Sequence, residues 1–111
     1  MNTTGSGQRA ERVVAGKLIE DGYEIIGQNW RTSICEIDIV AQKDKVIYFV
    51  EAKYRSTDKQ GVGFDYITER KIKQLKFAAE NWCQQTGWTG DWRLMAASVD
   101  TYDQVELIEL E

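Results

Sequence analysis

Two β-prone segments joined by a short polar link constrain the fold of this chain more than any other feature. Residues 36–42 read EIDIVAQ and residues 46–53 read VIYFVEAK, with Lys43-Asp44-Lys45 between them. Both segments are rich in β-branched and aromatic residues, and a polar link of this length is typical of an antiparallel hairpin. The sequence therefore predicts two neighbouring strands joined by a tight turn.

The rest of the chain indicates helices before and after this hairpin and further strands at both ends. Apolar residues recur at helical spacing in two segments, and Gly22 and Gly87 follow them as helix stops. Thr68 is the expected N-cap of the second helix, and Gly27 marks an expected bulge. In chain order the predicted elements are a flexible tail over 1–6, a helix over 7–21, a strand over 23–30, the hairpin, a helix over 69–86, and strands over 92–99 and 105–110.

The order α-β-β-β-α-β-β predicts one α/β domain over residues 7–111, with helices flanking an antiparallel or mixed sheet. No apolar run approaches the roughly 20 residues that a membrane-spanning helix needs. The first residues also lack the basic-then-apolar pattern of a signal peptide. We therefore expect a cytoplasmic protein with no membrane partner.

The absence of histidine among the 111 residues removes several kinds of chemistry. Catalysis by Ser-His-Asp or Cys-His groups is excluded, as is zinc held by histidine. Cys35 and Cys83 form no Cys-x-x-Cys pair, so a disulfide framework or a thiolate zinc site is not expected. Acid–base or metal chemistry must therefore come from Asp, Glu, Lys, Tyr or Cys.

Charge is unevenly distributed along the chain. The net charge of −4 argues against a nucleic-acid partner, yet residues 53–76 hold seven Lys or Arg against three Asp or Glu. A basic segment of this kind is compatible with a patch that faces phosphates, and also with an ordinary solvated surface.

Two acids and a lysine stand among the apolar residues of the hairpin. A two-residue turn at Asp44-Lys45 would place Asp38 directly opposite Glu51, and a three-residue turn would make them diagonal neighbours. Opposite Cβ atoms lie about 5 Å apart, so either register brings both carboxylates within reach of one ion. Lys53 follows Glu51 by two positions and therefore points to the same face.

This placement predicts a site for a divalent cation. Like charges this close repel each other, and a cation relieves that repulsion. Mg²⁺ prefers oxygen ligands, and Asp38, Glu51 and the carbonyl of Ala52 would supply three. The metal would activate a water, and Lys53 would hold that water or a phosphate. The same residues also fit a cross-strand salt bridge on an exposed sheet face, so a purely structural role stays open.

A longer set of motifs resembles the YraN-like family of the PD-(D/E)XK nuclease superfamily. The matching segments are GQRAE (7–11), DGY (21–23), QNWR (28–31), EIDIVA (36–41), FVEAKYR (49–55) and Lys71. That family is similar in fold to archaeal Holliday junction resolvases and restriction endonucleases. The resemblance implies a restriction-endonuclease-like α/β fold with a central mixed sheet flanked by helices.

The resemblance also implies an activity and a site. The activity is Mg²⁺-dependent endonucleolytic hydrolysis of DNA phosphodiester bonds, with Mn²⁺ as a substitute and branched or repair intermediates as candidate substrates. By the same resemblance, Asp38 and Glu51 are metal ligands, Lys53 is the catalytic lysine and Glu11 is a further carboxylate of the metal shell. A homodimer would provide two such sites for two DNA strands.

Two residues of the basic segment are expected to contact DNA: Arg55, which lies beside the motif, and Lys71, which matches the family. The chain departs from the family at Cys35, where glycine is usual, and at Met95, where aspartate is usual. Two alternative functions stay open. One is a catalytically silent nucleic-acid-binding module, and the other is an interaction protein without nucleic acid, which the acidic composition favours.

Overall fold

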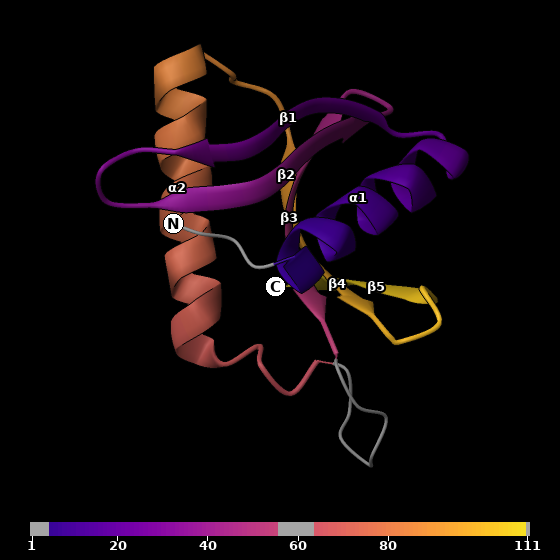
Figure 1. The fold of residues 1–111 in the computed structure, drawn as a ribbon. Coiled ribbons are helices and arrows are strands. Elements are labelled where there is room, and N and C mark those ends of the chain that lie inside the picture. The colour runs from indigo at the N-terminus through magenta and orange to yellow at the C-terminus, as the bar shows by residue number, and fades with distance from the viewer. Residues whose placement is uncertain (1–4, 56–63, 111) are drawn as a thin grey trace.

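A mixed sheet with a helix packed on each face forms the body of the protein (Figure 1). This computed structural model describes residues 5–55 and 64–110, which form two helices and five strands. They are α1 (Gly5–Glu20), β1 (Glu24–Arg31), β2 (Glu36–Lys43), β3 (Val46–Tyr54), α2 (Glu69–Thr86), β4 (Trp92–Val99) and β5 (Val105–Leu110).

The strands lie side by side in the order β1-β2-β3-β4-β5. Neighbouring strands are antiparallel except β3 and β4, which are parallel and are connected through α2. This is the predicted restriction-endonuclease-like α/β fold. No helix in the described residues is long and apolar enough to cross a membrane.

The element boundaries lie close to the predicted ones. The last two strands match their predicted ranges, and α2 begins after Thr68 and ends at Gly87, as expected. The register of β1 and β2 shifts between Ile25 and Gly27, which confirms the bulge. Helix α1 begins at Gly5 instead of residue 7, and residues 1–4 of the expected tail lie outside the described residues.

The hairpin between β2 and β3 has the tighter of the two expected turns. Asp44 and Lys45 both have positive φ values, 54° and 69°, as a two-residue type I′ turn requires. Lys43 therefore pairs with Val46, and the predicted two-residue register is confirmed.

Each helix covers its own face of the sheet with an apolar surface. Helix α1 packs Ala10, Val14 and Leu18 against one set of strand residues, and α2 packs Leu75 and Ala79 against another. Since strand side chains alternate between the faces, β3 contributes to both cores. The central strands are packed on both faces, and this packing positions the residues at the ends of those strands.

The sheet opens into a fork between β2 and β3, beyond the pair Ile39–Val50 (Figure 1). From there β2 continues alongside β1, and β3 continues alongside β4. At the mouth of the fork, Oδ2 of Asp38 accepts a hydrogen bond of 2.8 Å from the backbone N–H of Ala52. The expected pairing of Asp38 with Glu51 is thus replaced by a gap that the Asp38 carboxylate bridges.

Candidate active site

Asp38 lies at the fork in a half-buried position that is unfavourable for a negative charge. Burial of the carboxyl group raises the pKa of Asp38 to about 7, with further contributions from the negative charges of Glu51, Glu11 and Glu36. The hydrogen bond from Ala52 acts in the opposite direction and favours the carboxylate. The fork therefore gathers more negative charge than its surroundings stabilise, and a bound cation would relieve that excess.

Glu11 reaches the same cluster from α1, on the other side of the sheet from α2. Burial raises the pKa of Glu11, and so do the charges of Glu36 and Glu51, whereas a hydrogen bond with Asn29 lowers it. Asn29 lies within β1 with a positive φ of 53°, a conformation that asparagine tolerates better than most residues. Glu11 thus joins acids that are distant from it in the sequence.

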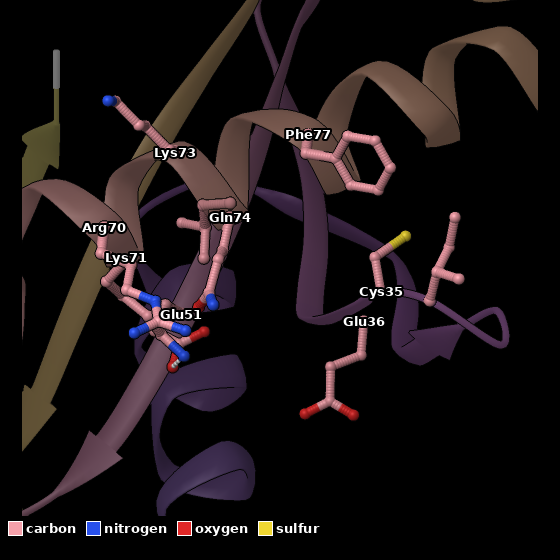
Figure 2. A pocket seen from close by; sticks show the side chains of 10 residues that line it. Cys35, Glu36, Glu51, Arg70, Lys71, Lys73, Gln74 and Phe77 are labelled. Carbon is pink, nitrogen blue, oxygen red and sulfur yellow. Dashed lines mark ion pairs between the residues drawn. The ribbon is translucent and has the colours of Figure 1, made fainter.

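Glu51 is paired with a lysine from α2. Its Oε2 atom lies 3.1 Å from Nζ of Lys71, and both side chains are largely shielded from solvent (Figure 2). Lys71 sits in the first turn of the helix, where its backbone N–H donates to the Thr68 hydroxyl that caps α2. The structure therefore brings Lys71, which the sequence assigned to DNA phosphates, into the acid cluster itself.

Tyr66, in the segment before α2, contacts the backbone of Glu51 and was not singled out from the sequence. Its hydroxyl group donates to the backbone carbonyls of Ala97, at 3.1 Å, and Glu51, at 3.4 Å. Burial raises the pKa of Tyr66, and the negative charges of Glu51 and Asp38 raise it further. The residue ties the segment before α2 to the β3–β4 pair. Because its partners are backbone atoms, no side-chain pattern in the sequence signals this role.

Lys53 and Arg55 occupy the end of β3 beyond the acids. Lys53 is exposed, pairs with Ser98 of β4 and, two residues after Glu51, points to the same face of the strand. Arg55 is half-buried, and its backbone N–H donates to the carbonyl of Val99. Lys53 is therefore accessible to a substrate that approaches the face of Glu51.

The carboxylates lie near one another without converging on a point. Within the described residues, no group of three or more His, Cys, Asp or Glu side chains is arranged to hold a metal ion. The predicted shell of Glu11, Asp38 and Glu51 is therefore not assembled as the side chains stand. Lys71 occupies one side of Glu51 and supplies the positive charge there.

The donor set nevertheless suits a hydrated divalent cation. In an extended strand the N–H and C=O of one residue point to the same side, so the carbonyl of Ala52 faces Asp38 as its N–H does. Mg²⁺ is commonly held by one or two carboxylates and retains several waters. Asp38, Glu51 and the Ala52 carbonyl match that requirement in number and chemical type, with Glu11 behind them.

A pocket of about 490 Å³ extends from Glu51 along α2 to the start of β2. Figure 2 shows the polar ends of Arg70 and Gln74 beside Glu51, with Cys35 and Phe77 across the pocket. Cys35 is half-buried, and its sulfur lies 3.4 Å from the hydroxyl of Thr32. The side chain that replaces the family's usual glycine therefore forms part of the pocket wall.

Met95 is the other departure from the family pattern, and it lies away from the pocket. It is 4% exposed and belongs to the core under α1, where its strand position pairs with Val50. A carboxylate at this position would have to lose its hydration, which is costly in an apolar core. In this chain the residue contributes packing.

The fold and the fork together define a protein of the restriction-endonuclease-like α/β class. The chain belongs to the YraN-like family: the sequence profile described as "Uncharacterised protein family UPF0102" matches residues 10–107. This assignment confirms the resemblance that the sequence motifs indicated.

Individual relatives in that family are identical to this chain at about a third or more of the aligned positions. A UPF0102 protein of Fusobacterium nucleatum is 42% identical over 79 residues, covering 70% of this chain and 66% of that protein. A UPF0102 protein of Leifsonia xyli is 40% identical over 81 residues, covering 73% of this chain and 69% of the relative. One from Alkaliphilus metalliredigens is 33% identical over 94 residues, covering 84% and 82%. The matched segment thus spans about two thirds of the first two relatives' length.

Proposed function

We propose that this protein is a Mg²⁺-dependent endonuclease that hydrolyses phosphodiester bonds in DNA. The observation that carries the proposal is the fork in the sheet, where the half-buried Asp38 carboxylate accepts from Ala52 beside Glu51 and has no cationic partner of its own among the ion pairs of the described residues. A sheet gains no stability from such an arrangement, because like charges that are partly buried repel each other. A divalent cation between a phosphate and these acids would offset that cost.

The predicted metal-binding and catalytic residues each have a role in this proposal. Asp38, Glu51 and the carbonyl of Ala52 would hold Mg²⁺, which when bound supplies an activated water and neutralises charge on the phosphate. Glu11 would bind a water of the metal shell. Lys53, exposed on the face of Glu51, would orient the scissile phosphate through its ammonium group.

The proposal extends to location and assembly. Action in the cytoplasm agrees with Cys35 and Cys83 being free thiols. Repair or branched DNA would be the substrate class, with Arg55 holding the backbone outside the cleaved bond. Cleavage of both strands of a duplex would need two sites, which a homodimer would supply.

A second candidate function is a nucleic-acid-binding module without turnover. The ion pair between Lys71 and Glu51 favours it, because the lysine neutralises that acid without any metal. In such a module Lys71 would be structural, and divalent ions would have no effect on binding.

A nuclease assay with matched variants tests the proposal. Purified protein is incubated with labelled single-stranded, duplex and four-way-junction DNA in the presence of Mg²⁺, Mn²⁺ or EDTA. We expect cleavage that requires the metal and that falls at least about a hundredfold in Asp38→Asn and Lys53→Ala. Asp44→Asn is the control, because Asp44 lies in the exposed turn of the same hairpin. It should retain full activity.

A binding measurement separates the two candidate functions. Heat denaturation is measured at increasing Mn²⁺ concentration. Mn²⁺ should raise the midpoint temperature of the wild type and of Asp44→Asn, and should not raise that of Glu51→Gln. DNA binding without cleavage and without any metal effect would favour the silent module. Equal cleavage by wild type and Asp38→Asn would overturn the proposed active site.

A further inference from the structure

The pocket beside Glu51 has charged side chains at one end and the aromatic ring of Phe77 at the other, where Cys35 and Glu36 also line it (Figure 2). Glu51 and Lys71 lie at one end and Phe77 of α2 lies at the other, and Ile34 of the loop before β2 is a further lining residue. Such an arrangement suits a ligand with a charged group and a flat apolar group, since each end would satisfy one of them.

Two of the apolar side chains that line the pocket are exposed to solvent. Phe77 is 46% exposed and Ile34 is 68% exposed, whereas the other large apolar side chains of α2 pack against the sheet. An exposed aromatic side chain that lines a pocket provides a flat surface on which a nucleobase stacks. Ile34, which also lines the pocket, would add an apolar contact to the base.

The middle of the pocket carries donors for an anion and for a base edge. Arg70 and Gln74 are one helical turn apart on α2, so their side chains project from the same side of the helix. None of the ion pairs in the described part of the chain involves Arg70. Its guanidinium group is therefore available to a phosphate, and the amide of Gln74 to a base.

We propose that this pocket binds one unpaired nucleotide of a single DNA strand, with its base against Phe77 and its phosphate at Arg70. A base in an intact duplex is covered on both faces by its neighbours, so it cannot lie against Phe77 until it leaves the stack. A volume of about 490 Å³ is that of a small-ligand site. That size accommodates one nucleotide.

The position of the pocket assigns a substrate class to the proposed nuclease. Because Glu51 belongs to both the pocket and the acid cluster, the nucleotide in the pocket would adjoin the cleaved bond. The substrates would then be single strands, flaps or bulges. This part of the inference rests on the proposed function, whereas the binding of an unpaired nucleotide does not.

Binding in EDTA tests the inference without any cleavage. Fluorescence anisotropy is measured for a labelled single strand and for the same strand in a perfect duplex, with wild type, Phe77→Ala and Tyr102→Ala. We expect the wild type to prefer the single strand, and Phe77→Ala to weaken single-strand binding about tenfold and duplex binding less than about twofold. Tyr102, which is 76% exposed in the β4–β5 turn, is the matched aromatic control and should change neither affinity.

Arg70→Ala provides an independent readout of the phosphate contact. It should weaken both probes and reduce the slope of log affinity against log salt by about 0.7 for the single strand. Preference of the wild type for the duplex would overturn the inference, as would equal single-strand affinities for Phe77→Ala and Tyr102→Ala. If instead the expected affinities are found but Mg²⁺ produces no cleavage, the nuclease proposal fails and the nucleotide site stands.

Discussion

Asp38 is the residue whose chemistry depends most on its surroundings. The fork places its carboxyl group between strands, where burial and the neighbouring charge of Glu51 favour the protonated form. The unfolded chain imposes no such cost, so folding and proton binding at Asp38 are linked.

The pH dependence of stability follows from this linkage. The pKa of Asp38 rises from 3.8 in the unfolded chain to about 7 in the folded protein, so the folded state binds the proton more tightly. The contribution of Asp38 to the free energy of unfolding is therefore present at low pH and is lost as pH rises from about 4 to about 7. The free energy of unfolding should fall by up to about 1.4 kcal/mol per pH unit in that range. Urea denaturation in EDTA at a series of pH values measures the slope.

Asp38→Asn should flatten that slope, since an amide does not titrate in this range and its oxygen still accepts from the N–H of Ala52. Asp44→Asn, in the exposed turn, should keep the slope of the wild type. An Asp38→Asn protein with an unchanged pH profile would show that another group is responsible.

Helix α2 is the element that positions most of the candidate site outside the sheet. It begins at a cap in which the Thr68 hydroxyl accepts from Lys71, and it ends at Gly87 in the left-handed conformation with φ of 80°. Between these ends the helix directs Lys71 to Glu51 and places Phe77 in the pocket. The caps therefore determine the register in which the helix presents its functional side chains.

Two glycine-to-alanine substitutions test the effect of backbone conformation on stability, because neither glycine is crowded by its neighbours. A Cβ atom at Gly87 would meet nothing within 4 Å, but the left-handed backbone disfavours any L side chain. We expect Gly87→Ala to lower the free energy of unfolding by about 1 kcal/mol. Gly16, inside α1, also has open space and no positive φ, so Gly16→Ala should raise it by about 0.5–1 kcal/mol. Chemical denaturation measures both, and changes of the same sign would contradict this account.

At the scale of the whole molecule, an aromatic cluster around the buried Phe49 connects α2 to the sheet. Phe49 of β3 is fully buried and makes edge-on contacts with Trp82 of α2, at 5.4 Å between ring centres, and with Trp92 of β4, at 5.7 Å. Its loss would leave a cavity between two layers that the neighbouring side chains fill only in part.

Phe49→Ala should therefore cost about 3–5 kcal/mol of stability, most of what a domain of this size has. Tyr102→Ala removes an exposed ring and should change stability by less than about 0.5 kcal/mol. The midpoints of urea denaturation give both values. A cost for Phe49→Ala near that of Tyr102→Ala would mean that α2 is held by other contacts.

Local sequence signals predicted most of the elements because each signal acts over a few residues. The polar link between two β-branched runs was sufficient to predict the hairpin and to limit its register to two choices, and Thr68 and Gly87 predicted the ends of α2. Residues that act through distant partners were missed or assigned differently. Tyr66 bonds to backbone carbonyls, and Lys71 pairs with an acid from another element, so neither contact leaves a pattern in the sequence.

The amino-acid order alone determined the helices, the strands, the hairpin turn and the presence of Asp38 and Glu51 on adjoining strands, since propensity, capping and side-chain alternation are local properties. Only the tertiary structure decided that β2 and β3 separate just before these acids. It also decided that Glu11 and Lys71 approach them from opposite faces. Those features depend on how two helices pack against a twisted sheet, and packing is a property of the assembled chain.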